Sequence, residues 1–312
     1  MRDKIKLADL ESVLWKSWSQ ETSADSARWT KHNPAWGQCA VTALVVQDFL
    51  GGLLWRLDIS KHPNHIISVM RSHYFNNIDF CGDNIFWDID LSESQFGSGG
   101  HNEVRRYAEP AQEKTREYLL NNKSTKERYK KLRYRVNEIL SGENPIFKEQ
   151  TFMKCLMAAL DSNCQKGKYG CVVKNDGQIV VETFNSILDV CQDWSEPECI
   201  RVKNDIPSRT ESMIGCCSHA EEEALRVIRN MRLNPRECEL YVAGFRSNGL
   251  VYIKSEPVFT CLRCAIQLHM HGIGAIHVPC REGWAKLTAK EAVETAKKFA
   301  TQEKVLENYT SR

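Results

Sequence analysis

One histidine, one glutamate and two cysteines in the second half of the chain constrain its fold more than any other feature. The motif His219-Ala220-Glu221 is followed about forty residues later by Cys261-Leu262-Arg263-Cys264. One imidazole and two thiols can bind a single Zn²⁺ and leave a fourth position open for water. The chain must therefore bring two distant segments together, and the surrounding pattern predicts that each motif lies at the start of a helix.

The spacing within the two motifs assigns a role to each residue. A C-x-x-C pair at the start of a helix places both sulfurs near one ion, where the helix dipole favours thiolate. Glu221 can face the water at the open position without binding the metal, and can take and return its protons. We predict Zn²⁺ as the cofactor, His219, Cys261 and Cys264 as its ligands and Glu221 as the catalytic acid–base. The alternatives are a purely structural zinc, or cysteines that only pack.

The combination of H-x-E with C-x-x-C is the signature of zinc nucleobase deaminases. Residues 147–300 resemble the cytidine/deoxycytidylate deaminase superfamily, and the segments that carry the resemblance are HAEEEAL and EPVFTCLRCA. One position departs from the family: Thr260 stands where that family has proline before the first cysteine. YGCVVKNDGQIVVETFN resembles the deoxycytidylate branch. The resemblance implies that a cytosine nucleotide (dCMP or CMP-like) is converted to the uracil form with release of ammonia, that Asn185 binds the sugar, and that the enzyme is a homo-oligomer.

The resemblance also implies a second, structural zinc in the insertion that precedes His219. The expected ligands are Cys164, Cys191, Cys199 and Cys217, with Cys216 as the alternative to the last. Four further cysteines are expected to be small buried apolar residues: Cys155, Cys171, Cys238 and Cys280.

Strands that alternate with helices in the second half favour an α/β/α three-layer sheet with helices on both faces. Two strands, 169–175 and 178–184, are joined by Asn175-Asp176-Gly177, which is a hairpin signal. Further strands are expected at 239–244, 251–255 and 275–279. Helices are expected at 147–163 and 261–271, with others starting near residues 219 and 288.

The first half favours a smaller α+β domain. Helices are expected over 7–18 and from residue 39 to the Gly51-Gly52 stop, followed by strands at 53–59, 65–70, 72–79 and 84–91. Three residues follow one another in the order found in papain-like thiol hydrolases: Cys39 at a helix start, His73 on a strand and Asp90 on the next strand. The alternative is that Cys39 is a buried small residue, His73 a core histidine and Asp90 a turn residue.

Residues 1–107 also resemble the small bacterial YunG-like family, on WTKHNPAWGQCAVTALVVQDFLGG, SHYFN and WDIDLSESQF. This resemblance implies a fold more than a function. Between the two halves, residues 113–140 carry nine Lys and Arg against four Glu. We therefore predict a YunG-like domain at 1–107, a basic helical linker at 108–145 and a deaminase domain at 146–312. The basic helix could bind nucleic acid, but sparse aromatic residues favour a solvated helix.

Composition excludes some classes of protein. The net charge of +2 gives no dominant field for nucleic acid or acidic lipid. No apolar stretch approaches the length of a membrane span and no export signal is visible, so we expect a cytoplasmic protein whose 13 cysteines are reduced. The favoured function is a zinc-dependent nucleotide deaminase. The alternatives are a deaminase of single-stranded nucleic acid, or a thiol hydrolase or binding protein whose main activity lies at Cys39, His73 and Asp90.

Overall fold

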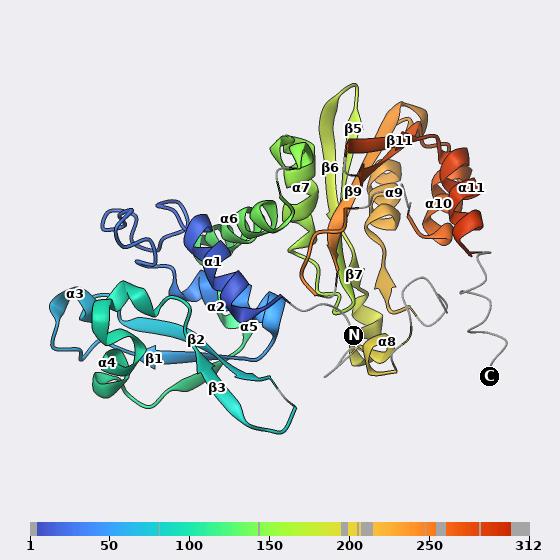
Figure 1. Ribbon diagram of the computed structural model, residues 1–312. Coiled ribbons are helices and arrows are strands. Elements are labelled where there is room, and N and C mark those ends of the chain that lie inside the picture. Colours follow the sequence, from blue (N-terminus) through green and yellow to red (C-terminus); the bar gives the residue numbers. More distant parts are fainter. Residues whose placement is uncertain are drawn as a thin grey trace. The chain divides into compact units, whose positions relative to one another are not determined.

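The chain divides into two compact units, Met1–Gly142 and Glu143–Arg312. The computed structural model describes residues 5–80, 82–142, 144–194, 199–204, 206, 215–246, 248–253, 260–280 and 282–300 (Figure 1). Within these residues no helix is both long and apolar enough to cross a bilayer. Both units combine helices with sheets, which confirms a mixed α/β protein.

The first unit is built on a four-stranded antiparallel sheet in the order β3-β2-β1-β4. The strands are β1 (Leu53–Asp58), β2 (Ser72–Asp79), β3 (Phe86–Ile89) and β4 (Gln112–Lys114). The helices are α1 (Leu7–Ser17), α2 (Cys39–Leu50), α3 (His65–Ser68), α4 (Gly100–Tyr107), α5 (Arg116–Leu120) and α6 (Lys123–Leu140), and a 3₁₀ helix spans Glu93–Gly99. The strongly apolar α2 packs against β2 on one side and α6 on the other.

The strand predicted at 65–70 is wrong, because this segment begins with the short helix α3. The side chain of Asn64 accepts a hydrogen bond from the backbone N of Ile66 at 2.9 Å and caps that helix. Asparagine in this position competes with an extended backbone, and an apolar run this short does not by itself distinguish the two states.

Most of the linker predicted at 108–145, residues 108–142, is instead part of the first unit. Helix α6 buries Tyr129, Leu132 and Val136 as it packs against α1 and α2. Arg133 is also buried, and its Nε donates to Oδ2 of Asp48 on α2 at 2.8 Å. Arg133 of this segment therefore serves packing and ion pairing, and the division between the units lies after Gly142.

The second unit contains a five-stranded sheet in the order β11-β10-β9-β5-β6. The strands are β5 (Gly167–Asn175), β6 (Gln178–Phe184), β9 (Cys238–Arg246), β10 (Ala275–Cys280) and β11 (Gly283–Leu287). Strands β9 and β10 are parallel, and the other neighbours are antiparallel. The predicted hairpin between β5 and β6 is confirmed: Asp176 and Gly177 both have positive φ, as a two-residue hairpin turn requires.

Helices cover both faces of this sheet. Helix α7 (Gln150–Ala159) packs on one face, and α9 (Ala220–Asn230), α10 (Leu262–Met270) and α11 (Ala289–Ala300) lie on the other (Figure 1). Alternation along β5 explains the two layers: Cys171 and Val173 pack into the core beneath α9, whereas a side chain at Gly170 would meet α7. The predicted three-layer arrangement is therefore present in this unit.

Smaller elements complete the second unit. A two-stranded ribbon, β7 (Ser186–Ile187) with β8 (Cys217–Ser218), leads directly into α9. The structure also contains α8 (Ile200–Lys203) and 3₁₀ helices at Pro145–Lys148, Asp189–Trp194 and Pro235–Glu237. In place of the strand predicted at 251–255 there is one isolated bridge, Phe245 with Val251, and residues 254–255 lie outside the described residues. Strand β11 was not predicted from the sequence.

Candidate metal centre and candidate thiol site

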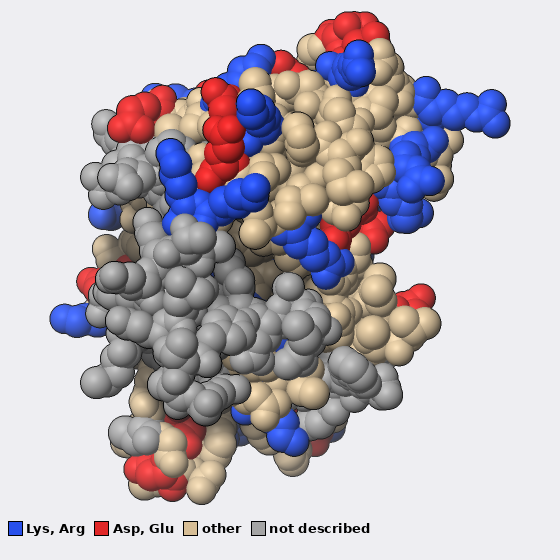
Figure 2. Space-filling model, turned by 90° about the vertical axis from the view of Figure 1, so that its right-hand side faces the viewer, with Lys and Arg blue, Asp and Glu red and all other residues tan. Residues whose placement is uncertain are grey.

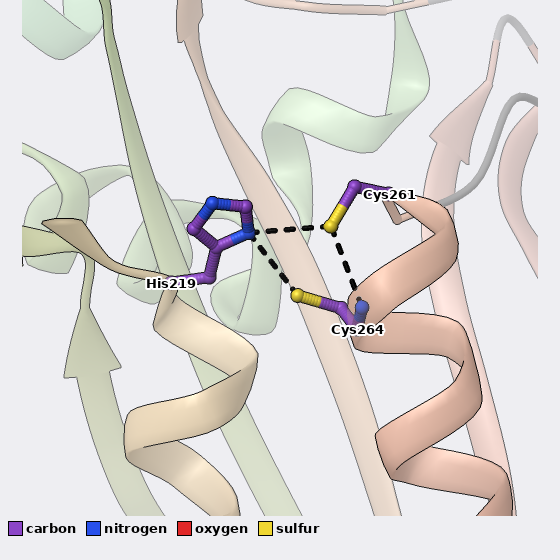
Figure 3. Close-up of side chains that lie close together, drawn as sticks. All are labelled: His219, Cys261 and Cys264. Carbon is purple, nitrogen blue, oxygen red and sulfur yellow. Dashed lines mark hydrogen bonds between the residues drawn. The ribbon is translucent and has the colours of Figure 1, made fainter. Parts of the chain in front are cut away.

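The structure brings together the three residues that the sequence predicts as zinc ligands. His219 precedes the first turn of α9, Cys261 precedes the first turn of α10, and Cys264 lies within that turn. Their ligand atoms all lie within 4.8 Å of one another. His219 Nδ1 is 3.1 Å from the Sγ of Cys264 and 3.3 Å from the Sγ of Cys261 (Figure 3). Two helix N-termini thus converge on one imidazole and two thiols.

Local contacts fix this geometry. The Sγ of Cys261 accepts a hydrogen bond from the backbone N of Cys264 at 3.4 Å, so the thiol caps its own helix. Glu222 on α9 accepts from the backbone N of His219 at 3.0 Å and from Nε of Arg263 on α10 at 2.6 Å. The same carboxylate therefore caps one helix and ties it to the other.

Charges at this centre favour metal binding. Hydrogen bonding to Cys264, and then to His219, lowers the pKa of Cys261 to about 4, whereas the pKa of Cys264 is raised by its thiolate neighbour. The interaction with Cys261 raises the pKa of His219 to about 9, although burial opposes it. Without a metal the centre thus carries a thiolate beside an imidazolium, and a cation of sufficient affinity replaces the protons.

Glu221 lies on the first turn of α9 and is 6% exposed. Burial raises the pKa of its carboxyl group to about 7, against the opposing attraction of His219. Its charge also acts on Cys264, and the charge of Cys261 acts on it. A carboxyl group that changes protonation near neutral pH and lies beside a candidate metal centre is suited to proton transfer.

The donor set fits zinc. One imidazole nitrogen and two sulfurs form the Cys₂His set of catalytic zinc sites, which keep a fourth position open. Tetrahedral bonds of ordinary length would place nitrogen and sulfur roughly 3.5 Å apart. The observed separations of 3.1 and 3.3 Å require the side chains to open by only a few tenths of an ångström.

Asn185 is a buried connector between strands. Its Oδ1 accepts from the backbone N of Tyr169 at 2.7 Å, and its Nδ2 donates to the carbonyl of Gly167 at 2.9 Å. These two bonds hold the end of β6 to the start of β5. Sugar binding by Asn185 stays a prediction, and only the remaining N–H and lone pair of the amide are available for it.

The cysteines predicted to bind a second zinc share one region. Cys199 and Cys216 are buried together, with Cys191 and Cys217 packed against them. Cys164 interacts with Cys217, which lowers the pKa of Cys164 to about 6. The Sγ atoms of Cys216 and Cys217 are 4.0 Å apart. Among the described residues these thiols do not form a group of three ligand atoms within 4.8 Å, so the second zinc stays a prediction.

In the first unit, Asp90 connects two buried histidines. Its Oδ2 lies 2.6 Å from Nε2 of His73 on β2 and 3.1 Å from Nδ1 of His101 on α4. Burial would lower the pKa of His73, but the Asp90 carboxylate raises it to about 10, and the pKa of Asp90 is correspondingly low. Cys39 at the start of α2 contributes to the same rise. The structure thus brings together all three predicted residues.

Sequence reasoning missed His101. It lies 11 residues after Asp90, in a helix that follows a glycine- and serine-rich stretch and that no periodicity predicted. Only the tertiary fold brings the ring of His101 to the carboxylate of Asp90, so no local sequence pattern could have predicted this contact.

Comparisons with known proteins concern the first unit. Residues 6–141 match the model of the family described as YunG protein. The Bacillus subtilis (strain 168) protein named "Uncharacterized protein YunG" is 46% identical over 67 residues, which are 22% of this chain and 48% of the relative. The chain thus spans about half the length of this relative. No solved structure matches the chain. The match extends past the boundary predicted at residue 107, and the N-terminal region of the chain matches the YunG family over residues 6–141.

Proposed function

We propose that the second unit is a zinc-dependent hydrolytic deaminase that acts on the cytosine ring of a nucleotide. The observation that carries the proposal is the convergence of His219, Cys261 and Cys264 next to the buried carboxyl group of Glu221. The three-layer sheet and the two convergent helix N-termini support it, because they present the predicted signature in the expected structural context. The nucleotide itself is inferred from the sequence resemblance.

His219, Cys261 and Cys264 would hold the zinc. Zinc, when bound, supplies a water of lowered pKa, so that hydroxide is present near neutral pH. Glu221 then holds and moves the protons: with a pKa of about 7, its carboxyl group can accept one and pass it to ring N3 of cytosine. A further proton must reach the amino group before ammonia leaves, and the same carboxyl group is placed to deliver it.

A free nucleotide is favoured over a nucleic-acid polymer. The basic helix α6, which was the sequence feature most suited to a polymer, buries Arg133 and packs within the first unit. On the face shown in Figure 2, basic and acidic side chains of the described residues are interspersed and separated by uncharged surface. A polymer site would need a basic groove with stacking aromatic residues.

Ammonia release with dCMP, CMP, cytidine and single-stranded DNA in parallel assays tests the proposal. We expect activity on a nucleotide, and a loss of at least about a hundredfold in Glu221→Gln with the zinc content unchanged. The matched control is Glu223→Gln on the same helix, whose carboxylate pairs with the surface residue Arg226. This control should keep its activity.

Several outcomes would contradict the proposal. Full activity of Glu221→Gln with zinc bound would remove the assigned role. Activity on DNA alone, with a steep salt dependence, would favour the polymer. Absence of activity on every cytosine compound by zinc-loaded protein would reject deamination. The homo-oligomer implied by the resemblance is tested separately by light scattering.

A further inference from the structure

Asp90 uses its two carboxylate oxygens for different purposes. Oδ1 accepts hydrogen bonds from the backbone N and the Oγ of Ser92, at 3.1 and 2.9 Å, which fix the turn after β3. Oδ2 is hydrogen-bonded to both Nε2 of His73 and Nδ1 of His101. Since all three side chains are buried, the carboxylate and the two rings hold one another in a single orientation.

The opposite side of the His73 ring faces a different environment. Within the described part of the chain, its Nδ1 is buried and has no hydrogen-bond partner. The ring interacts with the thiol of Cys39, and Phe96 packs edge-on against it with the centroids 4.8 Å apart. A buried ring nitrogen without a hydrogen-bond partner is costly, so its retention in a ring that also interacts with a thiol points to a function.

Two further features place positive charge near the sulfur of Cys39. The thiol lies at the N-terminus of α2, a helix of 12 residues, where the partial positive charge attracts an anion. Arg128 of α6 is close enough for its guanidinium to interact electrostatically with the same sulfur. Positive groups therefore surround Cys39 from α2, β2 and α6.

We propose that the first unit contains a second catalytic centre, in which Cys39 is the nucleophile of an acyl-transfer reaction on amide or ester substrates. Cys39 Sγ attacks the carbonyl carbon, and an S–C bond forms as the bond to the leaving group breaks. His73 gives its Nδ1 proton to the leaving group. Water then attacks the thioester carbonyl and His73 takes a proton from that water. The S–C bond breaks, the carboxylic acid is released, and Cys39 is regenerated as a thiolate beside protonated His73. Asp90 and His101 are positioning residues that act through His73.

The geometry distinguishes this centre from a metal site built from His73, Asp90 and His101. A histidine that binds a metal almost always donates its other ring nitrogen to a carboxylate, carbonyl or water. Here the far nitrogens, Nδ1 of His73 and Nε2 of His101, are both without a hydrogen-bond partner among the described residues. A nitrogen left free toward a thiol is instead what a general base requires.

Competitive alkylation of the full chain by iodoacetamide, followed by peptide mass spectrometry, measures the reactivity of Cys39. The matched reference is Cys280, because the two residues are 6% and 8% exposed. We expect Cys39 to react about tenfold faster or more. Equal rates at the two cysteines would overturn the proposal. The zinc-site variant His219→Ala should leave the Cys39 rate unchanged, which separates this test from the test of deamination.

Incubation with p-nitrophenyl acetate tests the acyl step. We expect release of p-nitrophenolate with an acetyl group on Cys39, and its loss in Cys39→Ser and His73→Gln. In Asp90→Asn and His101→Gln, the pH profile of Cys39 alkylation should shift. Urea unfolding shows whether each variant is still folded, and in a folded variant a merely structural role would leave this profile unchanged. Unchanged profiles would remove the positioning roles. A reactive Cys39 that never carries the acetyl group would overturn acyl transfer, and a zinc ion that is lost in His73→Gln would favour the metal instead.

Discussion

Glu222 and Arg263 join the N-termini of α9 and α10, with Nε of Arg263 donating to Oε1 of Glu222 at 2.6 Å. The second oxygen of Glu222 accepts from the backbone N of His219 at 3.0 Å. The two segments that carry the candidate zinc ligands are thus connected by a residue that binds no metal itself. Such contacts around a metal site hold the ligands in position before the ion binds.

We therefore expect Glu222→Ala to weaken zinc binding by about tenfold. The backbone at His219 would lose its cap and α9 would lose its connection to α10. Competition with a chromogenic chelator measures the affinity. Glu223→Ala is the control, because Glu223 pairs with Arg226 within one helix. Equal affinities in the two variants would show that the connection does not position the ligands.

Metal analysis can count the zinc sites. If the second predicted zinc is present, the protein should contain two ions per chain, and His219→Ala and Cys199→Ser should each contain one. Cys199 is the better choice for the second site, since it is buried in the cysteine cluster and is not one of the three residues grouped at His219. One ion in the fresh protein and none in His219→Ala would eliminate the second site.

The grouping of His219, Cys261 and Cys264 was predictable from the sequence because these residues lie within two short motifs. His219 and Glu221 lie two residues apart, and Cys261 and Cys264 lie three residues apart within a single helical turn. Local spacing therefore determined most of the geometry, and only the meeting of α9 with α10 depended on the fold. The hairpin at Asp176-Gly177 was predictable for the same reason.

Features that depend on long-range packing were not predictable. The many charges in residues 113–140 indicated a solvated linker. This prediction was wrong because no local pattern shows that Arg133 reaches Asp48 on another helix. His101 was missed because only the tertiary fold brings it to Asp90. The segment 65–70 was assigned to a strand from its apolar residues, although Asn64 caps a helix there.

Asp48→Asn should destabilise the first unit by about 3–5 kcal/mol, because it leaves buried guanidinium groups without their counter-charge. The carboxylate is 2.8 Å from both Arg116 Nη2 and Arg133 Nε, and accepts from the hydroxyl of Tyr129 at 2.6 Å. Urea unfolding measures the change. Glu21→Gln, which removes an exposed pair with Arg135, should have a much smaller effect.

Gly170→Ala should destabilise the second unit by about 1–3 kcal/mol. A Cβ at this position would lie 2.0 Å from the carbonyl oxygen of Cys155, so α7 would have to move away from β5. Gly167→Ala on the same strand is the control, because its nearest contact is the ring of Tyr169 at 3.1 Å, which can rotate. Thermal unfolding of the two variants compares them, and equal midpoints would contradict the close approach of helix and strand.

The ion pair between His73 and Asp90 makes a pH-dependent contribution to the free energy of unfolding. The pKa of His73 is raised from its ordinary 6.5 to about 10, so its contribution is complete below about pH 6.5 and is lost as the pH rises toward 10. The pKa of Asp90 is lowered from 3.8, so its contribution is present above that value and is lost in stronger acid. The pair should therefore stabilise the first unit most between about pH 4 and 6.5.

Asp90→Asn should consequently cost most stability near pH 5.5, roughly 3 kcal/mol for a broken buried pair, and clearly less near pH 10. Urea unfolding followed by tryptophan fluorescence at both pH values measures the difference, since six of the eight tryptophans lie in residues 1–142. His73→Gln should show the same trend, because either change removes the pair. A difference from the unchanged protein that is constant with pH would mean that His73 is neutral in the folded state, and the role of Asp90 would then be limited to hydrogen bonding.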